Sequence, residues 1–185
     1  MLGATTSELN LTTVSRLAKV SPAQTSRVLP HLVDLGIVTR RDVPPTALFT
    51  LNRDHIAAPA VELLLRPREL LVDRIRASAG RIRPKPLNIT LFGSIARGSG
   101  GPDSDIDLAV IRPDGIAAED PDWVESMIRW EDDVRSASGN TVNVIEVTDG
   151  ELRSSLRSRA SFWREVAEQG ITVMGRSISE LAHTR

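Results

Sequence analysis

The sequence predicts an α+β fold in two parts: a mixed sheet with flanking helices in the second half, and a small helical domain with a hairpin before it. Two observations support this. Between Leu87 and Ile111 two runs alternate apolar and polar residues, which is the period of half-buried strands. Between Leu11 and Leu51 apolar residues at helical spacing precede two short runs around Pro44-Pro45, which predict a hairpin.

Composition limits the classes of protein that this chain can represent. The 185 residues are 41% hydrophobic and 25% charged, as expected for a globular protein. Cysteine is absent, which excludes disulfides and thiol catalysis. No apolar run approaches the ~20 residues of a membrane span, and Met1 is not followed by a signal-like segment. We therefore expect a soluble cytoplasmic protein without a membrane partner.

Charge is distributed unevenly along the chain. Residues 1–86 carry 13 Lys/Arg against 7 Asp/Glu, a net charge of +6, whereas residues 87–185 carry 10 against 17, a net charge of −7. This asymmetry favours nucleic acid as a partner of the first part and a cation-requiring site in the second. Because most of the basic excess lies in 57–86, a solvated helix face explains it nearly as well.

Two helices open the chain in this prediction. The first covers Leu11–Lys19, and the second starts after Ser21, which is an N-cap residue followed by proline at the first helical position. Gly36 ends the second helix. Its predicted buried residues are Val28, Leu29, Leu32, Val33 and Leu35.

Two helices, a short turn and a basic hairpin resemble a winged helix-turn-helix domain over residues 1–56. The resemblance implies that the second helix enters the major groove of DNA, while the hairpin contacts phosphates. The residues so implicated are Gln24, Thr25, Arg27, Arg40 and Arg41. Such domains usually have a helix before Leu11, which often helps them to form dimers. Residues 1–10 are too short and polar for a good helix, so the resemblance leaves both a homodimer and a monomer open. The alternative is a small helical domain that binds protein or supports the rest of the chain.

A long helical stretch follows the hairpin. Apolar residues between Ile56 and Arg83 recur at helical spacing, with a bend or break expected at Pro67. Pro84 closes the stretch, since residues before proline avoid helical angles. The predicted division is therefore 1–56 for the first domain, 57–84 for a linking helix and 85–185 for the second domain.

The most informative stretch joins the two predicted strands of the second domain. The first strand stops at Gly93-Ser94, where a glycine lets backbone N–H groups approach a ligand and a hydroxyl can donate to it. In the second strand Asp105 and Asp107 are two residues apart, so their carboxylates share one face, roughly 6–7 Å apart at Cα. Two such anions repel unless a cation lies between them, and hard divalent ions take oxygen ligands. The spacing predicts a magnesium site beside a phosphate-binding turn.

The run Gly93-Ser94-Ile95-Ala96-Arg97-Gly98, followed by Ser104-Asp105-Ile106-Asp107-Leu108, resembles the core signature of the minimal nucleotidyltransferases of the polymerase-β-like superfamily. The resemblance implies a nucleotidyltransferase-like mixed sheet over 85–185. It also implies Mg²⁺-dependent transfer of a nucleoside monophosphate from an NTP to a hydroxyl. Two ions would be held by Asp105 and Asp107, and the triphosphate by Gly93, Ser94 and Arg97. A salt bridge from Arg97 to the Asp103 loop is the structural alternative for that arginine.

Relatives of this fold place a third acid on the strand that corresponds to Thr141–Val147, where it completes the metal site and helps to deprotonate the acceptor. This strand offers Asn143 and Glu146, which point to opposite faces. Glu146 is the preferred third catalytic residue here, and Asn143 is the alternative, which would retain an oxygen ligand but lose a charge.

Other functions remain open at this point. One is a non-catalytic regulator that binds DNA and senses nucleotide or only forms dimers, and Asn143 favours it. Another, taken from the family resemblance, is an antitoxin that modifies a partner toxin.

The remaining predicted elements are a helix over Pro121–Ala137, a helix over Ser161–Gln169, a short strand over Ile171–Met174 and a polar C-terminal tail. The tryptophans of the first helix are interpreted as core residues rather than as base-stacking ones.

Overall fold

The computed structural model describes residues 7–101, 103–157 and 161–183. The chain forms two compact units, Met1–Pro67 and Arg68–Arg185. The division falls inside the segment 57–84 that the sequence predicted as one linking helix. This segment contains two separate helices, α3 (Ala58–Leu63) and α4 (Pro67–Ala79), and the second starts at the proline where a break was expected.

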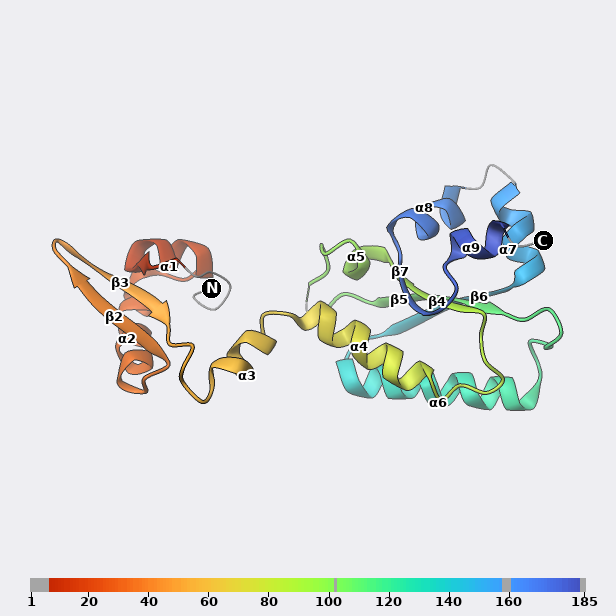
Figure 1. Ribbon diagram of the computed structural model, residues 1–185, viewed down its shortest axis with the longest axis horizontal. Coiled ribbons are helices and arrows are strands. Elements are labelled where there is room, and N and C mark those ends of the chain that lie inside the picture. Colours follow the sequence, from red (N-terminus) through yellow and green to blue (C-terminus); the bar gives the residue numbers. More distant parts are fainter. Residues whose placement is uncertain (1–6, 102, 158–160, 184–185) are drawn as a thin grey trace. The chain divides into compact units, whose positions relative to one another are not determined.

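The first unit contains the predicted helices and hairpin (Figure 1). Its strands form an antiparallel sheet in the order β1-β3-β2. In addition to α3, the elements are β1 (Leu9–Asn10), α1 (Leu11–Ala18), α2 (Pro22–Asp34), β2 (Val38–Val43) and β3 (Thr46–Leu51). A short strand, β1, therefore occupies the position just before Leu11 where the sequence offered no good helix.

Side-chain caps explain where the two helices begin. The Asn10 carboxamide accepts a hydrogen bond from the Thr13 N–H, and the Ser21 hydroxyl accepts one from the Gln24 N–H. Each bond satisfies a backbone donor that a helix N-terminus leaves without a partner. The core beneath consists of Val14, Leu29, Val38 and Phe49.

The buried face of α2 differs from the prediction. Val28 and Leu35 were expected inside, but their exposed fractions are 46% and 63%. They are seven residues apart and therefore share one face of the helix. The buried positions are Thr25 and Leu29, four residues apart on a different face, and Leu32 and Val33 are only partly buried beside them.

The second unit is built on a four-stranded mixed sheet in the order β6-β5-β4-β7 (Figure 1). Its strands are β4 (Asn88–Phe92), β5 (Ile106–Arg112), β6 (Val142–Thr148) and β7 (Ile171–Gly175). The pair β5 and β6 is parallel, and the other two pairs are antiparallel. A mixed sheet with flanking helices is thus confirmed for this part of the chain.

Helices cover both faces of this sheet. On one face α4 and α6 (Pro121–Ser138) pack against Ile106, Leu108 and Val110, which alternate along β5. The other face packs on a smaller cluster with α7 (Asp149–Arg157), α8 (Ser161–Gln169) and α9 (Ile178–His183). Because both faces of β5 are covered, this central strand is almost completely buried. No helix in the described ranges is long and apolar enough to cross a membrane.

The tryptophans of α6 are core residues, as predicted. Trp123 and Trp130 are 1% and 2% exposed and lie on the same face of the helix as Met127 and Val134. These large side chains fill the space between α6 and the sheet and have no free ring face for a nucleobase.

Two helices at the C-terminal end of the chain were not predicted. α7 and α9 each start at a capping box, in which a hydroxyl residue and a glutamate three positions later exchange hydrogen bonds. Thr148 and Glu151 form the first box, and Ser177 and Glu180 form the second. The expected polar tail is wrong for residues 178–183, because Ile178 and Leu181 are buried there.

Replacing Ser177 by alanine should lower the free energy of unfolding by about 1 kcal/mol, because the Glu180 N–H loses its acceptor at the start of α9. Urea denaturation followed by tryptophan fluorescence would measure the change. Ser179→Ala, an exposed change inside the same helix, is the control. Equal stability of the two variants would contradict a stabilising role for this cap.

Candidate active site

The turn between β4 and α5 (Gly93–Ala96) brings the backbone against an acidic side chain. Gly93 has a φ of +74°, a conformation that glycine adopts without strain. A Cβ built on Gly93 would lie 2.2 Å from Asp107 Oδ2. The structure therefore requires glycine at position 93 for two reasons. The backbone of the turn has a positive φ, and a side chain would occupy the space of the Asp107 carboxylate. Asp107 reaches this position because it pairs with Phe92, the last residue of β4.

Two carboxylates and one amide meet beside this turn. Asn143 Nδ2 lies 3.2 Å from Asp107 Oδ1 and 3.4 Å from Asp105 Oδ2. The parallel register of β5 and β6 produces this arrangement, since it places Asn143 beside Asp107. Asp105 and Asn143 are exposed and Asp107 is half-buried, so the group is open to solutes. The two aspartates share one face, as their spacing predicted.

The chemistry of this donor set fits a hard divalent cation. Two carboxylates and an amide carbonyl offer only oxygen ligands, the type that Mg²⁺ and Mn²⁺ take. The set contains only two acids, and in the described ranges no three or more His, Cys, Asp or Glu side chains gather as a metal centre. The third position of the site is an amide rather than a carboxylate.

The glycine-rich loop after α5 folds back on the turn. The Ser94 carbonyl accepts hydrogen bonds from the N–H groups of Ser99 and Gly100, each at 3.0 Å. The Gly101 N–H donates to the Ser104 hydroxyl at 2.8 Å. These bonds hold the loop next to the carboxylates, with the predicted nucleotide-binding residues Gly93 and Ser94 at its start.

Arg97 has a different partner from the one suggested for it. Its Nη1 lies 3.3 Å from Glu165 Oε1 on α8, and both side chains are about half exposed. The suggested salt bridge with the Asp103 loop is not among the ion pairs of the described residues. An exposed pair of this kind is weak, so the guanidinium is available to a phosphate.

Glu146, the preferred third acid, lies on the wrong face of the sheet. Its carboxylate accepts hydrogen bonds from Arg112 Nε at 2.5 Å and from Trp123 Nε1 at 3.0 Å. Both partners belong to the side covered by α6, whereas Asn143 lies on the side of the aspartates. Residues three apart in a strand point in opposite directions, so Glu146 cannot join the carboxylate pair. Asn143, the alternative, is the residue of this strand that lies beside the aspartates.

Glu146→Gln should therefore affect stability but not the aspartate site. The amide has one acceptor oxygen for two donors, and Arg112, only 8% exposed, loses its charge partner. We expect the free energy of unfolding to fall by about 1–3 kcal/mol. Urea denaturation and binding of a divalent ion with NTP would be measured together. A loss of ion binding without a loss of stability would restore Glu146 as a site residue.

One of the predicted DNA-facing residues is buried. Thr25 is 4% exposed, and its hydroxyl accepts a hydrogen bond of 2.9 Å from the Ser15 hydroxyl on α1. The Thr25 side chain therefore joins the two helices and is not exposed to DNA, which corrects the prediction. Gln24 and Arg27 on the same helix are exposed.

The two arginines of the hairpin lie on β2 in exposed ion pairs. Arg40 Nη2 is 2.7 Å from Asp42 Oδ1, and Arg41 binds Glu8, which precedes β1. The hydrogen bond from Arg41 lowers the pKa of the Glu8 carboxyl. Because exposed ion pairs of this type are weak, each arginine can leave its carboxylate partner for another anion.

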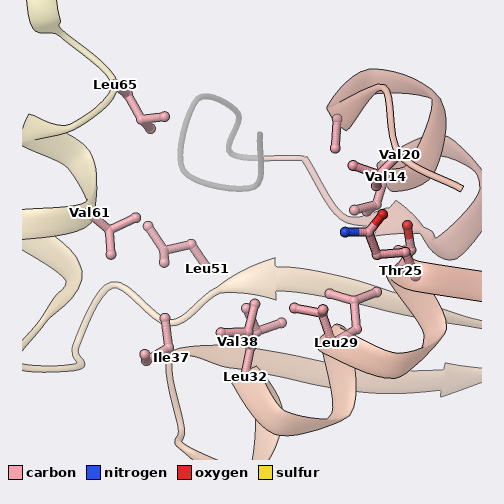
Figure 2. Close-up of a pocket in the computed structure, with 13 residues that line it drawn as sticks. Val14, Val20, Thr25, Leu29, Leu32, Ile37, Val38, Leu51, Val61 and Leu65 are labelled. Atoms are coloured by element: carbon pink, nitrogen blue, oxygen red, sulfur yellow. The ribbon is translucent and has the colours of Figure 1, made fainter.

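The first unit also contains an apolar cavity of about 480 Å³. Figure 2 shows Val14, Leu29, Leu32, Val38 and Leu51 around it, together with Val61 and Leu65 at the end of the unit. Thr25 lies at its wall on α2 (Figure 2). The face of α2 that carries Thr25 and Leu29 therefore borders an apolar cavity.

A glycine turn and a same-face pair of aspartates thus meet where β4 ends and β5 begins, in the middle of a mixed sheet. Residues 72–162 match the family model described as "Nucleotidyltransferase domain". The matched range covers about half of this chain and includes Asp105, Asp107 and Asn143. The match begins within α4, in agreement with the packing of that helix in the core of the second unit.

Three known proteins illustrate the similarity. The bifunctional uridylyltransferase/uridylyl-removing enzyme of Bordetella pertussis is 29% identical over 131 residues, which are 69% of this chain but 15% of that enzyme. The crystal structure of a toxin–antitoxin with AMP-PNP is 24% identical, with a TM-score of 0.42, over 60% of this chain and 80% of that one. A Sulfolobus solfataricus structure, provisionally described as a nucleotidyltransferase, is 20% identical, with a TM-score of 0.37, over 63% and 87%.

Proposed function

We propose that the second unit transfers a nucleoside monophosphate from an NTP to a hydroxyl acceptor, with a divalent cation bound by Asp105 and Asp107. The observation that supports this most is the convergence of one oxygen from each carboxylate on a single atom, Asn143 Nδ2. Both aspartates thus aim at one point beside the Gly93 turn. A bound cation would neutralise phosphate charge and polarise the reacting phosphorus centre.

The chain's own groups supply the remaining functions in this proposal. The Ser94 hydroxyl and the backbone N–H groups of the turn would hold the outer phosphates. Arg97, released from its exposed pair with Glu165, would neutralise the leaving pyrophosphate. The acceptor oxygen attacks the α-phosphorus as the bond to pyrophosphate breaks. An amide is not a base at neutral pH, so Asn143 leaves the acceptor proton to one of the aspartates or to solvent.

Label transfer from each α-³²P-labelled NTP with Mg²⁺, with cell extract as acceptor, tests the proposal. Label should move with the wild type and disappear with Asp105→Ala/Asp107→Ala. The matched control is Asp122→Ala/Glu125→Ala, which removes two exposed carboxylates from α6 on the opposite face of the sheet. Labelled protein would favour the antitoxin alternative, and labelled RNA or small molecules would favour other acceptors. Transfer that survives in the double aspartate variant would contradict the proposal.

Asn143 specifically favours a second candidate, a unit that binds nucleotide and cation but transfers slowly or not at all. Such a unit would act as a sensor coupled to the first unit. Ion-dependent NTP binding without label transfer would select this function.

We further propose that the first unit binds DNA through α2 and the hairpin. The support is the exposed Arg27 near the start of α2, together with Arg40 and Arg41 on β2, which are exposed in weak ion pairs.

Arg27→Gln should weaken binding to double-stranded DNA and lower the salt dependence of that binding, because one phosphate contact is lost; fluorescence anisotropy would measure both. Equal binding by Arg27→Gln and wild type would argue for the protein-binding alternative.

A further inference from the structure

Asn143 does more than replace a carboxylate. Its amide nitrogen donates to Asp107 at 3.2 Å and to Asp105 at 3.4 Å, so one neutral group bridges two anions. With its oxygen turned toward them instead, three acceptors would face one another without a donor. In the absence of a cation, the N–H groups must therefore face the carboxylates.

We propose that Asn143 occupies the place of the cation in the free protein and makes cation binding depend on the nucleotide. This inference rests on the proposed function. When an ion enters, the amide has to give up both hydrogen bonds and either turn its oxygen toward the ion or move away.

Charge supports the same conclusion. The site carries two negative charges, whereas a carboxylate at position 143 would give it three. Affinity for a hard cation rises with the number of charged ligands, so the free site should bind an ion weakly. An NTP brings several phosphate charges and further oxygen ligands. The ion and the nucleotide are thus expected to bind together, and each should strengthen the other by the same factor.

The test measures Mn²⁺ affinity by electron paramagnetic resonance on the full chain, with and without a non-hydrolysable NTP analogue. For the wild type, the analogue should tighten Mn²⁺ binding by at least ~10-fold. Asn143→Asp has the same shape but adds a charge, and should tighten binding of Mn²⁺ alone by at least ~10-fold. The factor by which the analogue tightens Mn²⁺ binding should be correspondingly smaller in this variant. The matched control for the measurement without the analogue is Gln169→Glu, the same amide-to-carboxylate change at an exposed position of α8, which should bind Mn²⁺ alone as the wild type does.

Asn143→Leu separates this role from a structural one. It keeps the approximate size and removes both donors, so the two carboxylates repel in the free protein. Mn²⁺ should then raise the Tm of this variant more than that of the wild type. Equal shifts in Tm, or Mn²⁺ affinities of Asn143→Asp and wild type that agree within threefold, would overturn the inference.

Failure of the inference is distinguishable from failure of the proposed function. If the analogue and Mn²⁺ bind together and require Asp107, but Asn143→Asp changes nothing, only the role of Asn143 is wrong. If the wild type does not bind the analogue with Mn²⁺, or binds it equally after Asp107→Asn, both proposals are wrong.

Discussion

Asp107→Asn is expected to abolish ion-dependent nucleotide binding and transfer while leaving the fold intact. The substitution keeps the shape of the side chain beside Gly93 and keeps an oxygen that can accept from Asn143. It removes one of only two charges in the site. Even groups that merely support a metal ligand contribute roughly 10–100-fold to affinity or activity, so we expect a loss of at least about 100-fold. Isothermal titration with Mn²⁺ and NTP, and the label-transfer assay, would measure it.

The control for this variant is Asp103→Asn, an exposed carboxylate on the adjacent loop. It changes the net charge equally but has no contact with the amide of Asn143 among the described hydrogen bonds. Thermal unfolding of both variants should match the wild type or, for Asp107→Asn, exceed it slightly because repulsion with Asp105 is relieved. Unfolding of Asp107→Asn would show that the side chain is structural and would count against a cation site.

Gly93→Ala is expected to have the second largest effect, and it acts on stability and site together. A non-glycine residue in the left-handed region costs roughly 1–2 kcal/mol. The added Cβ would also lie 2.2 Å from Asp107 Oδ2, so the carboxylate must leave its position. We expect the Tm to fall by roughly 3–8 °C and ion-dependent nucleotide binding to be lost.

Gly101→Ala is the appropriate control for this change. It lies in the loop that follows the same turn, and a Cβ there would have nothing within 4 Å. Its stability and its nucleotide binding should equal those of the wild type. Wild-type nucleotide binding by Gly93→Ala would mean that the position of Asp107 beside this turn is not required.

Local sequence patterns were sufficient to predict the central part of the candidate site, namely the aspartate pair and the glycine turn. Alternation placed Asp105 and Asp107 on one face, and the glycine after β4 predicted the turn, because both depend only on neighbouring residues. Caps and apolar spacing likewise located α2 and the tryptophan face of α6. These features need no knowledge of which elements pack together.

Features that depend on tertiary pairing were not predictable in the same way. Alternation shows that Asn143 and Glu146 face opposite sides, but only the parallel pairing of β6 with β5 decides which of them meets the aspartates. The burial of Thr25 likewise depends on a contact with α1.

The missed helices α7 and α9 are a different case, because the sequence contained a usable signal. Thr148 and Ser177 are each followed three residues later by glutamate, the pattern of a capping box. Apolar residues within these helices are few, so periodicity alone did not indicate them.

The order of the strands has a consequence for synthesis of the protein on the ribosome. β4 lies between β5 and β7, but β7 begins at Ile171, almost eighty residues after β4 ends at Phe92. At about 5–20 residues per second, one edge of β4 waits roughly 4–16 s for its partner. Until then its N–H and C=O groups on that side form an open template for another chain. Nascent chains that stall in this interval are the form of this protein most exposed to chaperone capture and aggregation.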